Sequence, residues 1–439
     1  MSDWRERYAD KRIEAGAALD LVRDGMIVHL GCAAATPRYL LPRLAARRER
    51  LRDVIVYGDI AFNGSHFDGT LDEQRHIDLR VSHVTLTRPV YQARRLSYTP
   101  ATIVNAHRRY DRIGNPDLGL FRLSEPDENG RMSFGSSLWD SKIMLRRCKK
   151  VVAEIEPDLL RCAGDNFVHI DEVDFWVEIE NEGAAPPISA ALPPATPEES
   201  AILDVAGAYA AELVQDGDTL EIGVGAAPIA ITPHLHHKRD LGYHSELTAP
   251  GIPALHEAGV INGRRKTHDP GKLVVTALPF DREELAIVAR NADAWVMRGI
   301  DYIHDIEIIR TQHQMTAINT GTMIDLTGQI VFDSIGHEIY TGPGGQIEFV
   351  VGAAYSPAGK NIHIFASQTN AGQSRIVAEL PPGSYVGTPR YFTDHVVTEY
   401  GLASLMGKTE RERALELIAL AHPDHQPELR NQARRLGLI

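Results

Sequence analysis

The sequence is poor in cysteine and in long apolar runs. Its three cysteines, Cys32, Cys148 and Cys162, are scattered over 439 residues, and no CxxC pair occurs. This pattern argues against a zinc site or a disulfide framework and fits a reducing, cytoplasmic setting. No apolar run reaches the roughly 18 residues of a membrane helix, and the charged stretch 1–12 does not read as a signal peptide. We therefore expect a cytoplasmic protein with no metal centre and no membrane span.

Positive charge is also scarce. The chain holds 46 lysines and arginines against 59 aspartates and glutamates, so its formal net charge is −13. Nucleic acids and anionic membranes reward basic surfaces, and the balance argues against both as partners. An anionic small molecule stays compatible with it, because backbone N–H groups and a few local cations can hold phosphates. The hydrophobic content of 43% is that of an ordinary globular protein, and the length suggests two or three domains.

The most informative feature that is present is an internal echo. Residues 21–44 and 213–235 both begin Leu-Val-x-Asp-Gly and continue with a strand-like stretch, a turn of small residues and a helix-like segment. A shared pattern of this length predicts two related α/β halves, and chance similarity is the alternative. A stretch rich in proline and alanine separates them and is typical of a linker. We predict an N-terminal domain over 1–185, a linker over 186–197 and a C-terminal domain over 198–439.

Strand-like and helix-like segments alternate along the chain. A helix is predicted over 197–214, with Thr196 as its N-cap and Pro197 at its first position. The segment from Thr409 to the end is also expected to be helical. Buried strands are predicted at 151–157, 173–179, 272–278, 294–300, 328–334, 346–353 and 361–367. Strands that alternate with helices predict mostly parallel sheets.

Two glycine-rich turns are candidate ligand contacts. In EIGVGAAP (221–228), a predicted strand ends in Gly223 and Gly225, which let another backbone or a ligand approach closely. In GPGGQIEF (342–349), three glycines precede a predicted strand, and such a loop can present N–H groups to a carbonyl oxygen. A tight strand–helix turn and a plain hairpin are the respective alternatives.

A histidine and a glutamate two residues apart form a third candidate. His244 and Glu246 lie in LGYHSEL, and in an extended segment they share a face and can act as acid and base. A polar loop whose glutamate caps or bridges a neighbour is the alternative, and on the sequence alone it is the more frequent one. In the segment 396–414, a turn at Gly401 precedes a charged helix whose charges are expected to face solvent.

These motifs, in this order, resemble the acetyl-CoA hydrolase/transferase family, which includes 4-hydroxybutyrate and acetate CoA-transferases. The resemblance covers nearly the whole chain, with LEIGVGAAP, LGYHSEL, DYIHDIEII, AINTGTMIDLTGQI, GPGGQIEFVVGAAYSPAGK and VVTEYGLASLMGK among its segments. It implies two similar open α/β domains with mostly parallel sheets and an active site in the crevice between them. It also implies an acyl-CoA substrate, CoA as substrate or product, and a homodimer or higher homo-oligomer.

One position departs from the family's pattern. In a transferase of the family, a glutamate attacks the acyl-CoA and passes through an anhydride to an enzyme–CoA thioester. The resemblance places that glutamate in a segment like Asn-Ser-Ala-Ile-Glu-Val-Asp-Leu, and here Met323 stands in its place. A thioether forms no acyl anhydride and carries no proton. Asp325 shares a face with Met323 in a strand and is a shorter candidate substitute.

The remaining pocket residues match what the resemblance implies. The expected CoA contacts are Gly223, Gly225, Gly342, Gly344, Gly345, Gln346 and Lys360, with the glycine loop along the pantetheine. Gly401 is expected to supply an oxyanion-stabilising N–H, and Gln373 is expected to be an amide donor. Such a site can still polarise a carbonyl for attack by water that His244 or Glu246 activates.

Three functions follow as hypotheses. A hydrolase of the thioester, or of a carbon–carbon bond β to it, is favoured because the expected nucleophile is missing. A CoA-transferase with a displaced carboxylate and a non-catalytic acyl-CoA-binding protein are the alternatives. Product without a carboxylate acceptor, exchange of CoA between two acids, and binding without turnover distinguish them.

Overall fold

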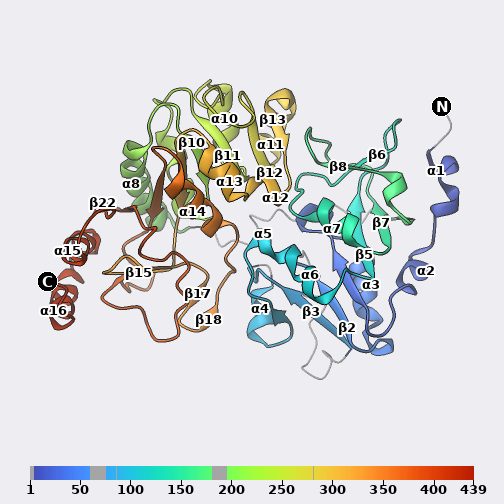
Figure 1. The fold of residues 1–439 in the computed structure, drawn as a ribbon, viewed down its shortest axis with the longest axis horizontal. Helices are drawn as coiled ribbons and strands as arrows, with labels where there is room; N and C mark the ends of the chain where they lie inside the picture. Colours follow the sequence, from blue (N-terminus) through green and yellow to red (C-terminus); the bar gives the residue numbers. More distant parts are fainter. Residues whose placement is uncertain (1–3, 60–75, 86, 180–194, 280) are drawn as a thin grey trace. The chain divides into compact units, whose positions relative to one another are not determined.

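The structure, a computed structural model, describes residues 4–59, 76–85, 87–179, 195–279 and 281–439. The chain forms two compact units (Figure 1). The first unit comprises residues 1–191 with 276–278 and 296–302, and the second unit comprises the rest. The predicted linker, 186–197, lies outside the described residues up to residue 194, so the predicted domain boundaries stay a prediction.

The first unit is built on a parallel sheet of seven strands in the order β4-β3-β2-β1-β5-β7-β9. The strands are β1 (Ile27–Leu30), β2 (Val54–Tyr57), β3 (Ile77–Val81), β4 (Ser97–Tyr98), β5 (Leu118–Leu123), β7 (Val151–Ile155) and β9 (Phe175–Glu178). Its helices are α1 (Trp4–Arg7), α2 (Ala15–Leu19), α3 (Leu40–Ala46), α4 (Arg88–Gln92), α5 (Ile103–Ala106), α6 (Tyr110–Ile113) and α7 (Ser141–Arg147). Every residue of β5 and β7 is buried, as expected for strands covered on both faces.

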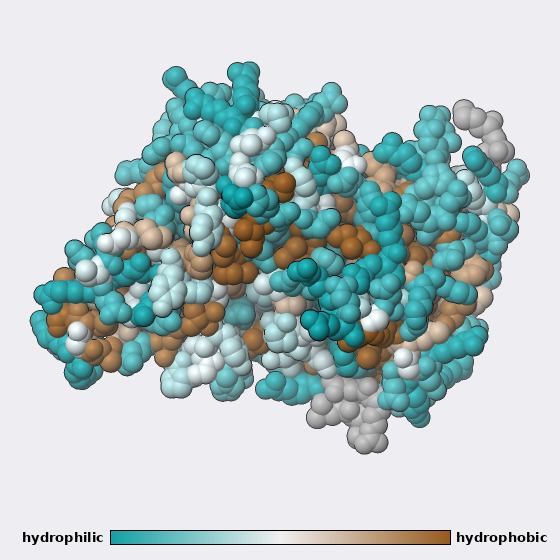
Figure 2. Space-filling model, in the orientation of Figure 1, coloured by the Kyte–Doolittle hydropathy of each residue, from teal (hydrophilic) through white to brown (hydrophobic). Residues whose placement is uncertain are grey.

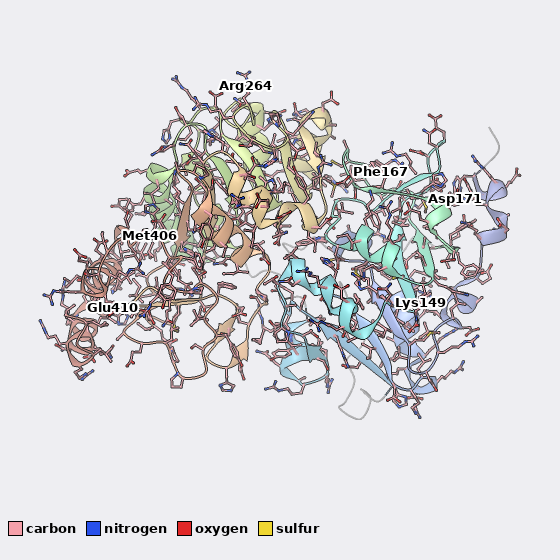
Figure 3. All side chains as sticks on the ribbon, in the orientation of Figure 1. Lys149, Phe167, Asp171, Arg264, Met406 and Glu410 are labelled. Atoms are coloured by element: carbon pink, nitrogen blue, oxygen red, sulfur yellow. The ribbon has the colours of Figure 1, made fainter. Side chains whose placement is uncertain are left out.

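A separate antiparallel pair, β6 (Arg131–Ser133) and β8 (Phe167–His169), completes this unit. The ring of Phe167, labelled in Figure 3, lies against two guanidinium groups, 4.3 Å from that of Arg131 and 5.2 Å from that of Arg161. These cation–π contacts tie the pair to the loop that holds Arg161.

The second unit is built on a sheet of eight strands in the order β13-β12-β11-β10-β14-β19-β21-β22. These are β10 (Thr219–Ile222), β11 (Gly242–Leu247), β12 (Leu273–Ala277), β13 (Trp295–Met297), β14 (Met315–Asn319), β19 (Lys360–Ile364), β21 (His395–Thr398) and β22 (Gly401–Ser404). The pairs from β11 through β10, β14 and β19 to β21 are parallel, and β22 returns antiparallel to β21.

The two sheets share one topology. In each, the first strand is central, the second and third follow in order on one side, and the later strands lie on the other side. The central strands β1 and β10 come from the two echoed segments. The prediction of two similar α/β halves with mostly parallel sheets is confirmed.

The helices of the second unit include α8 (Pro197–Leu213), α9 (Ala226–Ile229), α10 (Ile252–Glu257), α11 (Arg282–Arg290), α13 (Ile306–Thr311), α14 (Gln346–Tyr355), α15 (Glu410–Leu420) and α16 (Gln426–Arg435). The short helix α12 (Ile300–Ile303) belongs to the first unit up to residue 302. As predicted, Thr196 caps α8, because its hydroxyl accepts the N–H of Glu199 at 3.1 Å. The predicted C-terminal helices are also confirmed.

The predicted strand at 346–353 is wrong, because this segment is helix α14. A short, continuous apolar run fits a buried helix as well as a buried strand, and its period does not separate the two. The predicted strand at 328–334 shrinks to the two residues of β16 (Ile330–Val331), followed by β17 (Ser334–Ile335), which pairs with β18 (Glu338–Ile339).

A third, small sheet lies in the second unit. It has the order β16-β15-β20, with β15 (Met323–Asp325) in its centre and β20 (Ile376–Val377) at one edge. Its apolar side chains share a core with α15 and α16. Among the described residues, no helix has the length and apolar character to cross a bilayer, and the face drawn in Figure 2 is largely hydrophilic.

Candidate active site

Three polar side chains meet on one face of the second unit's sheet. They are Glu221 of β10, Glu246 of β11 and Asn319 of β14. The three strands are parallel neighbours in the sheet. Each of the three residues comes two or four positions after a residue that is paired with the neighbouring strand. Side chains at such positions point to the same face. Glu246 and Asn319 lie near the carboxyl ends of their strands, where open parallel sheets bind ligands.

The carboxylate of Glu246 is held by His304. The Nε2 atom of His304 lies 2.8 Å from Oε2 of Glu246. The His304 side chain is fully buried, whereas that of Glu246 keeps 16% of its surface exposed. The ring of Phe349, from α14, lies 5.2 Å from the His304 ring and fixes its orientation. The carboxylate is therefore oriented by a rigid N–H donor and remains accessible.

The glycine loop directly contacts this pair. A Cβ atom on Gly345 would overlap Nε2 of His304 and would lie 2.7 Å from Oε2 of Glu246. Gly345 is the N-cap of α14, and the next residue, Gln346, donates from its side chain to the carbonyl of Thr320 at 3.1 Å. The first N–H groups of a helix lack intrahelical acceptors and form its positive end. Negative charge that develops beside Glu246 therefore meets backbone donors.

Glu221 and Asn319 form the inner part of the cluster. The amide nitrogen of Asn319 donates to Oε2 of Glu221 at 2.8 Å. Burial, together with the charge of Glu246, raises the pKa of Glu221 well above its ordinary value. A Cβ on Gly223 would lie 2.5 Å from the amide oxygen of Asn319, so the glycine makes room for this amide.

His244 lies on the same face of β11, as predicted for an extended segment. It is fully buried, and its Nε2 donates to the carbonyl of Ile303 at 2.9 Å. Burial and the charge of Lys266 lower the pKa of His244 to about 3. Its contact with the residue before His304 supports the position of that histidine. The role of His244 as a base stays a prediction.

Met323 and Asp325 lie in the small sheet, on β15. Met323 pairs with Val331 of β16. The carboxylate of Asp325 accepts the N–H groups of residues 327, 328 and 329 within 3.0 Å and the side-chain amide of Gln329 at 2.7 Å. These bonds close the turn after β15, which is a structural use of the carboxylate.

Three other predicted residues lie apart from Glu246. Lys360 begins β19 at the amino edge of the sheet and pairs with Asp218 at 2.7 Å. Gln373 is exposed in the loop before β20, and Gly401 opens the hairpin strand β22. Gly401 lies beyond β21, and β21 itself is four strands away from β11 in the sheet, a separation of about 19 Å. The structure does not bring these residues into the Glu246 cluster.

Sequence reasoning missed His304 and Glu221 as site residues. His304 lies in the quoted segment DYIHDIEII, and Glu221 begins the quoted EIGVGAAP. A charged residue inside a fully buried strand was the available signal for Glu221.

Comparison with known proteins identifies the family. The sequence model of the acetyl-CoA hydrolase/transferase N-terminal domain matches residues 1–188, and that of the C-terminal domain matches residues 282–433. The chain is 34% identical over 438 residues to 4-hydroxybutyrate coenzyme A transferase of Clostridium kluyveri, covering 99% of both chains. It is 33% identical to succinyl-CoA:cyclohexane-1-carboxylate CoA transferase of Geobacter metallireducens, covering 99% of this chain and 98% of that one.

The fold agrees with a solved relative. The crystal structure of RipA from Yersinia pestis superposes with a TM-score of 0.88 at 30% identity and full coverage of both chains. The chain therefore belongs to the acetyl-CoA hydrolase/transferase family, and it is an enzyme of acyl-CoA chemistry.

Proposed function

We propose that this enzyme is a CoA-transferase that moves CoA from an acyl-CoA to a carboxylic acid, with Glu246 as its nucleophile. The observation that carries the proposal is an accessible carboxylate, oriented by His304, beside the backbone of the glycine loop. The two relatives that match over nearly their full length carry CoA-transferase names. Hydrolysis was favoured from the sequence because Met323 stands where the family's glutamate was expected. Glu246 supplies a carboxylate that makes transfer the better-supported chemistry.

The proposed reaction needs no water. The Glu246 carboxylate attacks the thioester carbonyl, the C–S bond breaks, and CoA leaves as a thiolate, which gives a mixed anhydride. The thiolate then attacks the Glu246 carbonyl, the anhydride C–O bond breaks, and the first acid leaves as a carboxylate. Glu246 now carries CoA as a thioester. The acceptor carboxylate repeats the two steps in reverse order, which releases the new acyl-CoA and restores Glu246.

The glycine loop has two tasks in this proposal. Its backbone approaches the carboxylate closely, so a thioester bound along it lies within reach of Glu246. The N–H groups at the start of α14, which form the positive end of the helix, favour the oxyanion that forms when the carbonyl is attacked. Gln346, through its bond to the Thr320 carbonyl, keeps the start of α14 fixed against the end of β14.

Hydrolysis of the thioester is the second candidate, since water can attack the Glu246–CoA thioester in place of a carboxylate. The family name covers both activities. Met323 gives no further support to hydrolysis, because it lies in the small sheet and the proposed route does not use it.

The test is mass spectrometry of the purified enzyme against a panel of acyl-CoAs, with and without acetate. Transfer predicts acetate-dependent acetyl-CoA, and without acceptor it predicts a peptide holding Glu246 that is heavier by CoA less one water. Hydroxylamine would release that CoA and leave a hydroxamate on Glu246. Free CoA that forms at the same rate with and without acetate would instead establish hydrolysis. Glu246→Gln would abolish the adduct, whereas Met323→Leu is the matched control and would keep it.

A homo-oligomer and a cytoplasmic location are also part of the proposal. Exposed apolar residues on α8 and near β22 support an interface between copies; they are Ile202, Val205, Tyr209, Leu402 and Met406, the last of which is labelled in Figure 3. The three cysteines form no disulfide, which fits a reducing compartment. Light scattering of the purified protein would give its mass in solution.

A further inference from the structure

Two carboxylic acids lie on neighbouring strands at the proposed site, and the proposed route uses only one. Glu246 is partly exposed, whereas Glu221 keeps only 3% of its surface. Both side chains point to the same face of the sheet, because β10 and β11 are parallel and in register. Glu221 therefore lies beneath the site rather than outside it.

The contacts of Glu221 lead to the amide of Asn319. Its Oε2 accepts the amide N–H at 2.8 Å, and the amide oxygen lies against the bare Cα of Gly223. Gly223 follows β10, the strand that lies between β11 with Glu246 and β14 with Asn319. Continuing the register of these strands places Gly223 between the two side chains. The glycine makes room for the Asn319 amide oxygen, while Glu221 binds the amide nitrogen on the inner side.

The groups around Glu221 make its neutral form the favoured one. Burial and the negative charge of Glu246 both raise its pKa. From β11, His244 is uncharged at neutral pH because burial lowers its pKa to about 3. From β19, His363 pairs with Asn319 in the ladder, and burial lowers its pKa to about 3 as well. His304 bonds to Glu246 rather than to Glu221.

We propose that Glu221 is a positioning residue that, in its neutral form, holds the Asn319 amide beside the reacting groups and leaves Glu246 as the charged carboxylate of the pair. This inference rests on the proposed nucleophile. Neighbouring carboxyl groups in different environments commonly divide the roles of acid and nucleophile in this way. A second charge at Glu221 would oppose the oxyanion that forms on the thioester.

The inference predicts a specific pH dependence. In the wild type, the rate of adduct formation at Glu246 would fall on the alkaline side as Glu221 loses its proton. Glu221→Gln stays neutral at every pH and accepts the same hydrogen bond, so it would keep the neutral-pH rate within about threefold and would lose the alkaline fall. Glu221→Ala leaves the buried Asn319 donor unpaired and would slow adduct formation about tenfold at all pH values, with KM for acyl-CoA little changed.

The experiment measures adduct formation by quenched mass spectrometry from pH 5 to 10 in the wild type and both variants. Infrared difference spectra of the free enzyme, recorded beside it, detect the carbonyl band of a protonated carboxylic acid. The expected result is a band at neutral pH that Glu221→Gln removes, together with loss of the alkaline fall in that variant. An adduct in the wild type with the same pH profile in Glu221→Gln would overturn this inference alone. No adduct in the wild type at any pH would overturn the nucleophile assignment and, with it, this inference.

Discussion

His304 and Glu246, which lie 58 positions apart in the sequence, are joined by a hydrogen bond of 2.8 Å. The histidine is fully buried, and the carboxylate reaches the surface. A buried ring held by packing against Phe349 has few rotamers, so its N–H defines one direction for the carboxylate oxygen that it binds. In the proposed reaction, the other carboxylate oxygen of Glu246 is the one that attacks the thioester carbonyl.

Loss of this donor should slow chemistry without weakening substrate binding. We expect His304→Phe to lower kcat about 10- to 100-fold, the equivalent of one hydrogen bond to a charged group, with KM little changed. His304→Gln can still donate an N–H and should recover part of the loss. Steady-state kinetics of both variants would check this. An equal fall in kcat for Phe and Gln would show that the ring itself, and not its N–H, is what matters.

Gly345 and Gly344 offer a matched pair of substitutions in one loop. Gly345 has φ −108°, which any residue adopts, but a Cβ there would strike His304 and Glu246. Gly344 has φ +55°, and a Cβ there would meet nothing within 4 Å. We therefore expect Gly345→Ala to abolish most of the activity and also to lower Tm, because the buried His304 ring must shift to admit the Cβ. Gly344→Ala should lower stability by about 1 kcal/mol and keep most of the activity. The reverse pattern would remove Gly345 from the site.

Glu221 should make the protein less stable as the pH rises. Its pKa is raised in the folded state, so above the ordinary glutamate range the unfolded chain releases a proton that the folded protein keeps. The unfolded state then binds fewer protons, and the unfolding free energy falls with increasing pH until Glu221 ionises in the fold. Glu221→Gln lacks this proton and should gain stability over the wild type between pH 5 and 8. A difference in Tm that does not change with pH would contradict the buried, neutral acid.

Three buried histidines predict acid instability. Burial lowers the pKa of His29, His244 and His363 to about 3. Each stays neutral in the fold while the unfolded chain binds a proton below pH ~6.5. Their contribution to stability is therefore full above that pH and is lost as the pH falls toward 3. We expect the unfolding free energy to drop by about 4 kcal/mol per pH unit below pH 6 from these residues together.

Denaturant titrations across pH 4.5–7 would measure that slope, and His363→Gln provides the control. Both ring nitrogens of His363 lack hydrogen-bond partners among the described residues. The substitution therefore removes one titrating group without breaking a side-chain hydrogen bond within that part of the chain. The change in unfolding free energy per pH unit should become about one third smaller, because one of the three histidines that cause it is gone. A slope that matches the wild type would mean that His363 is protonated in the folded protein.

Much of the architecture was available from the sequence, because it depends on local pattern. The echo of Leu-Val-x-Asp-Gly before β1 and β10 predicted two similar halves, and a threonine followed by proline and glutamates predicted the start of α8. The run QIEFVVGA was assigned to a strand and is helix α14, since continuous apolar residues suit either element when both are buried. That error matters, because a strand after the glycine loop has no N-terminal dipole. The prediction therefore did not include the helix N-terminus that lies beside Glu246.

The sequence by itself determined which functional groups the chain contains, among them Glu246 and the glycine loop, and it indicated the acyl-CoA chemistry of the family. Only the tertiary structure decided which of them meet. Glu246 joins His304 and Gly345 because three distant segments fold against one face of the sheet, whereas Lys360 is drawn to Asp218 at the opposite edge. Charge and burial at Glu221 likewise arise from neighbouring strands, since a pKa is set by the surroundings in space and not by the adjacent residues in the chain.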